Sequence, residues 1–440
     1  MRPARRAMTL LSGAIAARGA AMFLSVLLTW VVTRLLTEGS DKLAVGAWSV
    51  IYTALFAVAT VTRLGSENLA VKLAASEPAR AKLLLRGTIG TLVLLMVPAF
   101  PAMIAVTITR ESLASEILWL FMGVMLGFNV LALNVLVVCG AWLRGLGQVA
   151  LGTLLELGVV PGLTVAALAV LWLARGSVTL TETLVVYSSA TFMTCLVAAW
   201  VTLRAFSRVP TVAAEPNRPV RDYLREHGAS LTAFMMTGLG FYLYAYMPIL
   251  VFGAVNQDVA AAEFRSSYTL ASFVNLVPTL QIAYLTPVFA RLHHQGHLDE
   301  LRDRVWTATR NATAIALVVA IPLLVFPHAI LGAVFGAPFA EAGGMLRVLV
   351  VSLVAVVALG PTYALATTTG LERTTGVTMV AVLVVGLLLM VAALPISPLA
   401  VTIGGAAPAV LFALVSHQVL LRRRRVGTAI WDRPHQVAAS

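Results

Sequence analysis

Long apolar segments follow one another along this chain from Ser12 to Leu421, and only short polar breaks separate them. An α-helix needs about 20 mostly apolar residues to cross the hydrocarbon core of a bilayer. Hydrophobic residues make up 60% of the 440 residues and charged residues 11%, and the mean hydropathy is +0.92. This composition leaves too little polar surface for a soluble domain, so we expect an all-α, polytopic membrane protein.

Twelve of these segments are long enough to span a membrane, and a proline-rich break divides them into two sets of six. We predict an N-terminal six-helix bundle at 1–209, a cytoplasmic linker at 210–226, a C-terminal six-helix bundle at 227–423 and a cytoplasmic tail at 424–440. The predicted spans, to within several residues, are 10–36, 44–70, 84–109, 114–142, 149–174, 182–205, 228–253, 260–290, 306–333, 344–368, 374–395 and 398–421.

Basic residues concentrate at the termini and in every second break between spans. The odd-numbered breaks carry only Lys42, Arg110 and Arg175 as basic residues. Because cytoplasmic loops of membrane proteins hold the excess of lysine and arginine, we expect both termini in the cytoplasm and the chain in a bacterial inner membrane. The net charge of +12 belongs to these breaks, so no nucleic-acid partner is expected.

Polar residues inside the predicted spans recur at helical spacing in the first, second and eighth spans. An ionisable group inside a bilayer is costly, and a functional role is the default hypothesis for it. If a pseudo-two-fold axis relates the two halves, these polar faces meet in a water-filled central cavity. The candidate substrate-binding residues are Arg18, Thr29, Arg34, Thr60, Arg63, Arg265, Tyr268, Ser272 and Asn275.

The arginines indicate the chemistry of the cargo. Arg18 and Arg63 each lie about eight residues from the cytoplasmic end of their spans, or about 12 Å deep. Arg34 and Arg265 lie nearer the outer face. A guanidinium group binds phosphate oxygens with two parallel hydrogen bonds and stays charged, so an arginine pair suits a diphosphate better than a sugar. We therefore expect an anionic, lipid-linked cargo.

Each candidate also has a purely structural explanation. Arg63 lies four residues before Glu67, and the two can simply neutralise each other. Arg34 and Arg265 can extend to the membrane interface, as long basic side chains often do. Serine and threonine are common where membrane helices pack together. No catalytic residue, metal site or cofactor is expected, because the histidines of 293–297 lie in a cytoplasmic break without matching ligands.

Several stretches together resemble one known family. They are Thr33–Leu36 with Ala44–Trp48, then Arg63–Ala70, then Tyr268–Ser272 continuing to Thr286–Arg291, and finally Leu331–Ala342. Their order and position in the spans are similar to the oligosaccharide flippase branch of the multidrug/oligosaccharidyl-lipid/polysaccharide exporter superfamily. The resemblance covers most of the chain in layout.

The resemblance implies two six-helix bundles arranged in a V, open alternately to either side of the membrane. It implies a flippase that carries a polyprenyl-diphosphate-linked oligosaccharide to the periplasmic leaflet for surface polysaccharide biosynthesis. The expected partners are this lipid-linked oligosaccharide, membrane lipids, and the polymerase and glycosyltransferases of the pathway. Two departures from the family are the polar turn at Thr37–Lys42 and the lack of the two extra C-terminal helices of lipid II flippases, which favours a polysaccharide cargo.

Two other function classes fit the residues less well. A cation-coupled multidrug exporter of the same fold normally needs a buried carboxylate, and Glu156 is the only mid-span acid in the first half. A membrane enzyme of the same pathway would need a long periplasmic loop with catalytic acids, which the break lengths do not provide, so we expect no enzyme. The sequence leaves open the sugar composition of the cargo, the driving force and the oligomeric state.

Overall fold

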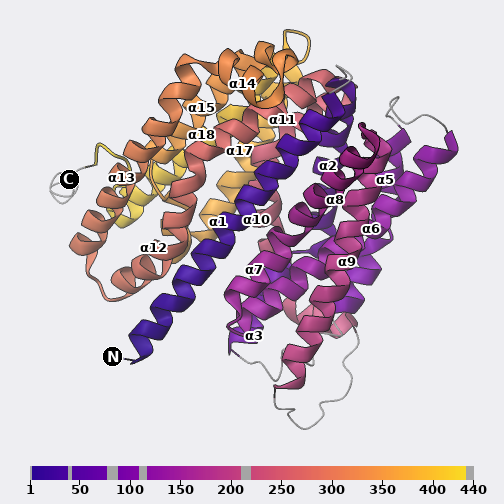
Figure 1. Cartoon of the computed structure of the whole chain (residues 1–440). Coiled ribbons are helices and arrows are strands. Elements are labelled where there is room, and N and C mark those ends of the chain that lie inside the picture. Colours follow the sequence, from indigo (N-terminus) through magenta and orange to yellow (C-terminus); the bar gives the residue numbers. More distant parts are fainter. Residues whose placement is uncertain (1, 38–41, 77–87, 109–115, 210–219, 433–440) are drawn as a thin grey trace. The chain divides into compact units, whose positions relative to one another are not determined.

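The computed structural model describes residues 2–37, 42–76, 88–108, 116–209 and 220–432 (Figure 1). Every regular element in these ranges is a helix, which confirms the all-α prediction. The chain divides into two compact units. The N-terminal unit comprises Met1–Leu239 with Asn256–Val259, and the C-terminal unit comprises Gly240–Val255 with Ala260–Ser440.

The N-terminal unit is built around one long helix that contacts most of the others. Trp142 on this helix is fully buried and packs edge-on against Phe206, with the ring centroids 5.4 Å apart. Leu92 and Leu231 complete the same core cluster. The unit contains α1 (Arg2–Thr37), α2 (Lys42–Arg63), α3 (Ser66–Ser76), a helical segment at 88–96, α5 (Ala99–Ile108), the central α6 (Glu116–Gly145), α7 (Val149–Leu157), α8 (Val159–Arg175), α9 (Leu180–Ser207) and the first part of α10 (Val220–Ala254).

The C-terminal unit has its own core, in which Phe289, Leu301 and Val305 pack with Leu365 and Leu420. It therefore buries its helices independently of the first unit. After the remainder of α10 it contains α11 (Asp258–Ala271), the 3₁₀ turn η1 (Ser272–Asn275), α12 (Leu276–His294), α13 (Leu298–Val325), α14 (Pro327–Phe335), the 3₁₀ turn η2 (Ala337–Ala342), α15 (Gly343–Ala358), α16 (Thr362–Thr368), α17 (Glu372–Ala393) and α18 (Pro398–Arg424).

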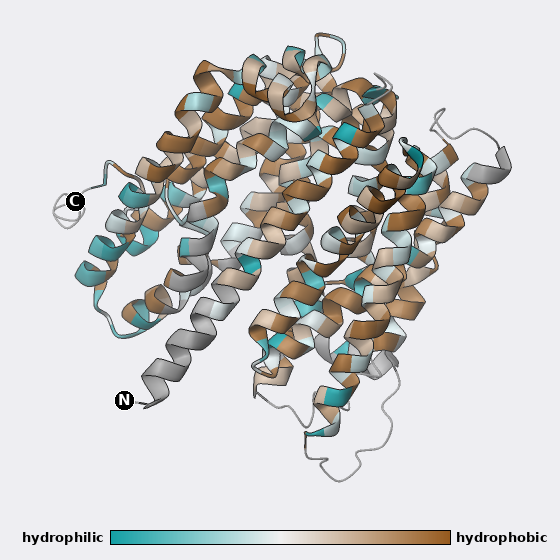
Figure 2. Ribbon diagram, viewed as in Figure 1, coloured by the Kyte–Doolittle hydropathy of each residue, from teal (hydrophilic) through white to brown (hydrophobic). Residues whose placement is uncertain are grey.

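The described helices have the length and surface of membrane spans. Ten of them are long and apolar enough to cross a bilayer, and the count rises to eleven if α7 and α8, which meet at a bend of 45°, form one span. Figure 2 shows hydrophobic residues along most of each long helix and hydrophilic residues mainly toward helix ends. Leu173, Leu196 and Val318 are 76%, 72% and 72% exposed, as expected of side chains that face lipid.

The predicted second span, 44–70, is shorter than expected. It ends at Arg63, because Leu64 and Gly65 both adopt left-handed backbone conformations, with φ of 53° and 68°, and α3 begins directly afterwards. A Cβ atom on Gly65 would lie 2.5 Å from the Cβ of Phe234, so only glycine fits this turn. The turn places the end of α2 against the start of α3.

The predicted eighth span, 260–290, is not one continuous α-helix. The 3₁₀ turn η1 interrupts it between α11 and α12. The Ser272 hydroxyl donates to the carbonyl oxygen of Thr269 at 2.7 Å, and such local bonds compete with the helical pattern. Pro278 has no N–H to donate to the carbonyl four residues earlier, so the α-helical ladder lacks one hydrogen bond at the break. The expected polar stripe is therefore divided between α11, which ends at Ala271, and η1, which begins at Ser272.

The segment after α18 packs into the C-terminal unit. Residues Val426, Thr428 and Ala429 are fully buried, although the sequence analysis placed them in a tail. Three side chains of α13 hold this segment: Arg302, Trp306 and Thr309 donate to the carbonyl oxygens of residues 425, 430 and 428 at 2.9, 3.0 and 3.0 Å. The predicted linker at 210–226 lies partly outside the described residues, and its last seven residues belong to α10.

Candidate functional site

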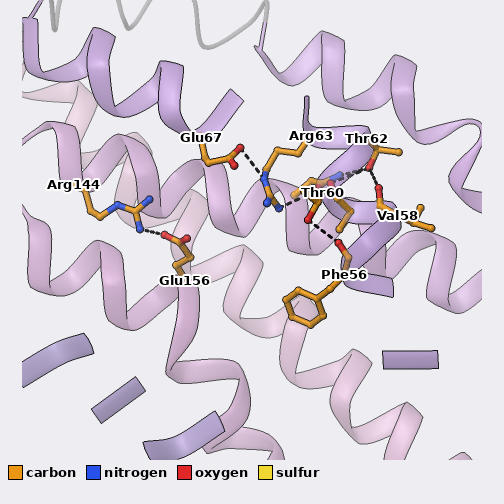
Figure 3. Close-up of polar contacts among 10 residues, drawn as sticks. Phe56, Val58, Thr60, Thr62, Arg63, Glu67, Arg144 and Glu156 are labelled. Atoms are coloured by element: carbon orange, nitrogen blue, oxygen red, sulfur yellow. Dashed lines mark hydrogen bonds and ion pairs between the residues drawn. The ribbon is translucent and has the colours of Figure 1, made fainter. Parts of the chain in front are cut away.

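The turn between α2 and α3 brings two predicted charges together in the N-terminal unit. The Arg63 Nε donates to Glu67 Oε2 at 2.9 Å, and the two side chains are only 12% and 13% exposed (Figure 3). Arg63 stands in the last turn of α2 and Glu67 in the first turn of α3. Each charge therefore complements the partial charge of its own helix end, which stabilises the pair further.

A buried asparagine of α6 extends this ion pair. The Arg63 Nη1 approaches Asn134 Oδ1 at 3.5 Å, and Asn134 Nδ2 donates to the Thr62 hydroxyl at 2.8 Å. Asn134 is completely buried in the middle third of α6. Because a buried amide is costly unless it is hydrogen-bonded, these contacts fix the position of the Arg63 guanidinium.

A second ion pair, Arg144–Glu156, joins α6 to α7 (Figure 3). The two helices approach closely at Gly140 and Gly152: a Cβ on Gly152 would lie 2.4 Å from the Gly140 carbonyl oxygen. Small residues let membrane helices pack with their backbones nearly in contact. The same glycines leave room for the pair, since the Arg144 side chain lies over Gly152 and the Glu156 side chain over Gly140.

The two pairs lie along α6, and α1, which carries Arg18, packs beside them. Arg144 belongs to α6, and Arg63 contacts Asn134 of the same helix. At the end of α7, two residues after Glu156, a Cβ on Gly158 would lie 3.4 Å from the Cα of Ala21, about one helical turn beyond Arg18 on α1. Three arginines and two glutamates leave this charged network with one formal positive charge in excess. Arg18 is exposed on α1. The network therefore presents an accessible guanidinium beside two that are already engaged, an arrangement that attracts an anion.

Of the other predicted residues of the N-terminal unit, Thr60 lies beside Arg63 (Figure 3), whereas Thr29 and Arg34 belong to the last third of α1. The hydroxyls of Thr29 and Thr60 donate to carbonyl oxygens four residues earlier in their own helices, at 3.2 and 2.8 Å. Such bonds are typical of buried threonines that pack between helices. Arg34 stands in the last turn of α1, where a cation complements the helix end. Their predicted role in binding cargo stays a prediction.

In the C-terminal unit, Arg265 joins an aromatic cluster. Its guanidinium lies over the ring of Tyr246, 5.2 Å from the centroid, which is a cation–π contact. Tyr246 packs edge-on against the predicted Tyr268, with ring centroids 5.2 Å apart, and its ring is tilted by 40° against that of Tyr242 at 5.0 Å. The structure thus brings Arg265 and Tyr268 to one place, next to two tyrosines of α10.

The residues at the helix break lie elsewhere in this unit. Asn275 lines a small cavity of about 70 Å³ with Gln281 of α12 and Thr309 of α13. A volume of this size accommodates about two water molecules. Ser272 donates to a nearby backbone carbonyl, as described above. The predicted set is therefore divided: Arg265 and Tyr268 join the aromatic cluster, Asn275 lines a mostly apolar cavity, and Ser272 belongs to neither.

Sequence reasoning missed the Arg144–Glu156 pair. Arg144 falls in the break between the predicted spans 114–142 and 149–174, one of the basic breaks expected in the cytoplasm, and Glu156 was noted only as an isolated acid. The signal was present in the sequence: a single carboxylate inside an apolar span needs a cationic partner, and Arg144 is the basic residue that precedes it most closely. Gly140 and Gly152 form the contact between the two helices, but glycines are too common in such helices for this pair alone to predict a contact.

Comparison with known families now identifies the class of protein. A family model described as a polysaccharide biosynthesis protein matches residues 8–293, well over half of the chain. The chain belongs to this family. No curated protein matches the sequence. As a member of the polysaccharide biosynthesis family, the chain falls in the MOP exporter superfamily, as the resemblance of its motifs predicted, and it is a multi-pass membrane transporter rather than an enzyme.

Solved structures of the same superfamily share the fold. An inward-facing multidrug resistance MATE family transporter aligns with a TM-score of 0.66 at 16% identity, over 97% of this chain and 99% of its own. A MATE structure in complex with MaL6 gives 0.63 at 16%, over 98% and 97%. A MOP superfamily transporter from Pyrococcus furiosus, described as having a binding pocket of reverse polarity, gives 0.62 at 16%, over 92% and 93%. These likenesses show the fold of a MOP transporter.

Proposed function

We propose that this chain is a flippase for a polyprenyl-diphosphate-linked oligosaccharide, acting by alternating access in surface polysaccharide biosynthesis. In this proposal the termini and the basic breaks are cytoplasmic, and the cargo passes from the cytoplasmic to the periplasmic leaflet of the inner membrane. Glycosyltransferases would supply the cargo, and a polymerase would consume it. The family match favours this class of cargo.

The observation that carries the proposal is the charged network of the N-terminal unit. Arg63 and Arg144 each pair with a glutamate, and Arg18 on the neighbouring α1 adds a third guanidinium to these two carboxylates. Charge-assisted bonds from guanidinium groups to phosphate are among the strongest hydrogen bonds available to a protein. A diphosphate that binds at Arg18 would balance the excess positive charge, which a neutral drug or a cation would not.

The same network argues against a cation-coupled drug exporter. Such a transporter needs a carboxylate that can exchange a cation, and the resemblance to MATE structures makes this class the natural alternative. Glu67 and Glu156 are both held by arginines. Each carboxylate is neutralised by a permanent cation, so neither is suited to binding Na⁺ or H⁺ in turn.

Measurement of surface polysaccharide in a set of variants tests the proposal. Arg18→Ala should abolish export while the protein remains in the membrane, and Arg18→Lys should restore it only in part, because lysine keeps the charge but loses the planar fork. Full export by Arg18→Ala would rule out the proposed diphosphate site.

A double variant separates the two roles of Arg63. If Arg63 only neutralises Glu67, then Arg63→Ala together with Glu67→Ala should export normally, since no unpaired charge is left behind. If Arg63 also binds phosphate, the double variant should stay inactive and Glu67→Ala alone should remain active. The matched control is Arg175→Ala, because Arg175 pairs with Glu182 on the exposed surface, far along the chain from the network.

A further inference from the structure

An open groove runs between α15 and α18 in the C-terminal unit. The two helices start at the same end, since a Cβ on Gly344 would contact the Leu399 side chain at 3.5 Å (Figure 1). The groove has a volume of about 490 Å³ and extends from Arg347 to Ala355 along α15, about 12 Å at 1.5 Å per residue. Small residues, among them Ala406 and Ala407, form its floor.

The rim of the groove is apolar and exposed. Val351 of α15 is 56% exposed and Ile403 of α18 is 53% exposed. Exposed branched aliphatic side chains on membrane-spanning helices face lipid rather than water. The groove therefore opens toward the acyl chains of the bilayer, and its dimensions suit one extended hydrocarbon chain.

Arg347 stands at one end of this groove. Its Nε donates to the carbonyl oxygen of Leu324, in the last turn of α13, at 3.2 Å. Within the described residues, no carboxylate pairs with the exposed Arg347, and its two Nη groups remain available. Arg347 is the fifth residue of α15, about one turn from the N-terminal helix end that attracts anions. A guanidinium exposed at this place is positioned to pair with an anion from outside the chain.

We propose that this groove binds one anionic diacyl phospholipid, with its phosphodiester on the Nη groups of Arg347 and one acyl chain between α15 and α18. A single guanidinium matches the single charge of a phosphodiester. The lining contains no second cation that a diphosphate would require, and no carboxylate that would attract the amine of a zwitterionic headgroup. On the topology proposed above, the lipid belongs to the periplasmic leaflet, yet its binding does not depend on the identity of the cargo.

Native mass spectrometry of the delipidated full chain, titrated with phosphatidylglycerol or phosphatidylcholine, tests the proposal. The wild type should retain one phosphatidylglycerol in preference to phosphatidylcholine. Arg347→Gln should weaken the retention of phosphatidylglycerol about tenfold and remove the preference, because the charge-assisted bonds are lost. Arg347→Lys should keep part of the preference.

Two further variants test the contribution of the apolar groove and the specificity of the charge effect at Arg347. Ala407→Phe should fill the groove and lower the retention of both phospholipids, whereas the control Arg423→Gln, an exposed arginine at the other end of α18, should behave as the wild type. Equal retention by the wild type and Arg347→Gln would overturn the proposal. Displacement of the bound phospholipid by an equimolar polyprenyl diphosphate would also overturn it, because the groove would then belong to the cargo. Neither result bears on the Arg18 export test.

Discussion

Gly140 and Gly152 determine where the second ion pair of the network can form. Their contact brings α6 and α7 close enough for Arg144 to reach Glu156, and any side chain at either position would occupy the space of the pair. Charged residues inside apolar spans are readily recognised as candidates in a sequence, whereas the glycines that position them are not. A change at these glycines should therefore act on both packing and charge.

We expect Gly152→Ala to destabilise the protein by about 1–3 kcal/mol, the usual cost of overpacking a close contact. The new Cβ would lie 2.4 Å from the Gly140 carbonyl oxygen and 2.9 Å from the Arg144 Cγ. Thermal unfolding in detergent measures the effect. Gly376→Ala is the matched control, because nothing lies within 4 Å of a Cβ there and alanine favours the helix. Equal stability of the two variants would contradict the close contact.

The helices were largely predictable from the sequence, because a bilayer demands long apolar segments. The interruptions within these helices were not predictable. Pro278 is visible in the sequence of 260–290, but a proline can also lie inside a continuous helix, as Pro322 does, so it did not locate η1. The pairing of Arg63 with Glu67 was foreseen as an alternative from its spacing of four residues. Arg144–Glu156 was not, because it depends on which helices touch.

The helix break makes a prediction about transport. Pro278→Ala restores an N–H that can continue the α-helical ladder through η1, so the segment should straighten and lose a point of bending. Breaks inside membrane helices are common where transporters change shape. We expect surface polysaccharide to fall several-fold, with normal protein levels. Pro322→Ala, which removes another in-helix proline of the same unit, should have a smaller effect. Normal export by Pro278→Ala would show that the break is not needed for transport.

The segment after α18 makes a prediction about stability. A chain that ends after Arg425 loses the hydrogen bonds from Trp306 and Thr309, a contact of 2.9 Å between His417 and the Thr428 hydroxyl, and the buried Val426. At about 1 kcal/mol per hydrogen bond, we expect the free energy of unfolding to fall by about 2–5 kcal/mol. Thermal unfolding measures the loss. Thr428→Val, which removes one hydroxyl, should cost less than the truncation, and the reverse order would be inconsistent with this packing.

At the scale of the whole molecule, the distribution of basic residues determines how the chain is threaded through the membrane. The turns at Asn256 and Gly296 flank the interrupted helix of α11, η1 and α12. If that region crosses the bilayer once, the two turns lie on opposite sides. A reporter fused after Gly296 should be active in the cytoplasm, and one fused after Asn256 in the periplasm. Reporters on the same side at both positions would show that the interrupted helix does not cross.

The buried segment of 426–432 also has a consequence for how the protein is made. The side chains of Arg302, Trp306 and Thr309 leave the ribosome 123, 124 and 119 residues before the partners that satisfy them. Until those partners follow, α13 carries unsatisfied donors at its start. A nascent chain that stops before residue 426 therefore exposes hydrogen-bond donors of α13 that are satisfied in the complete protein. We expect cellular proteases to degrade such a truncated chain faster than the complete one.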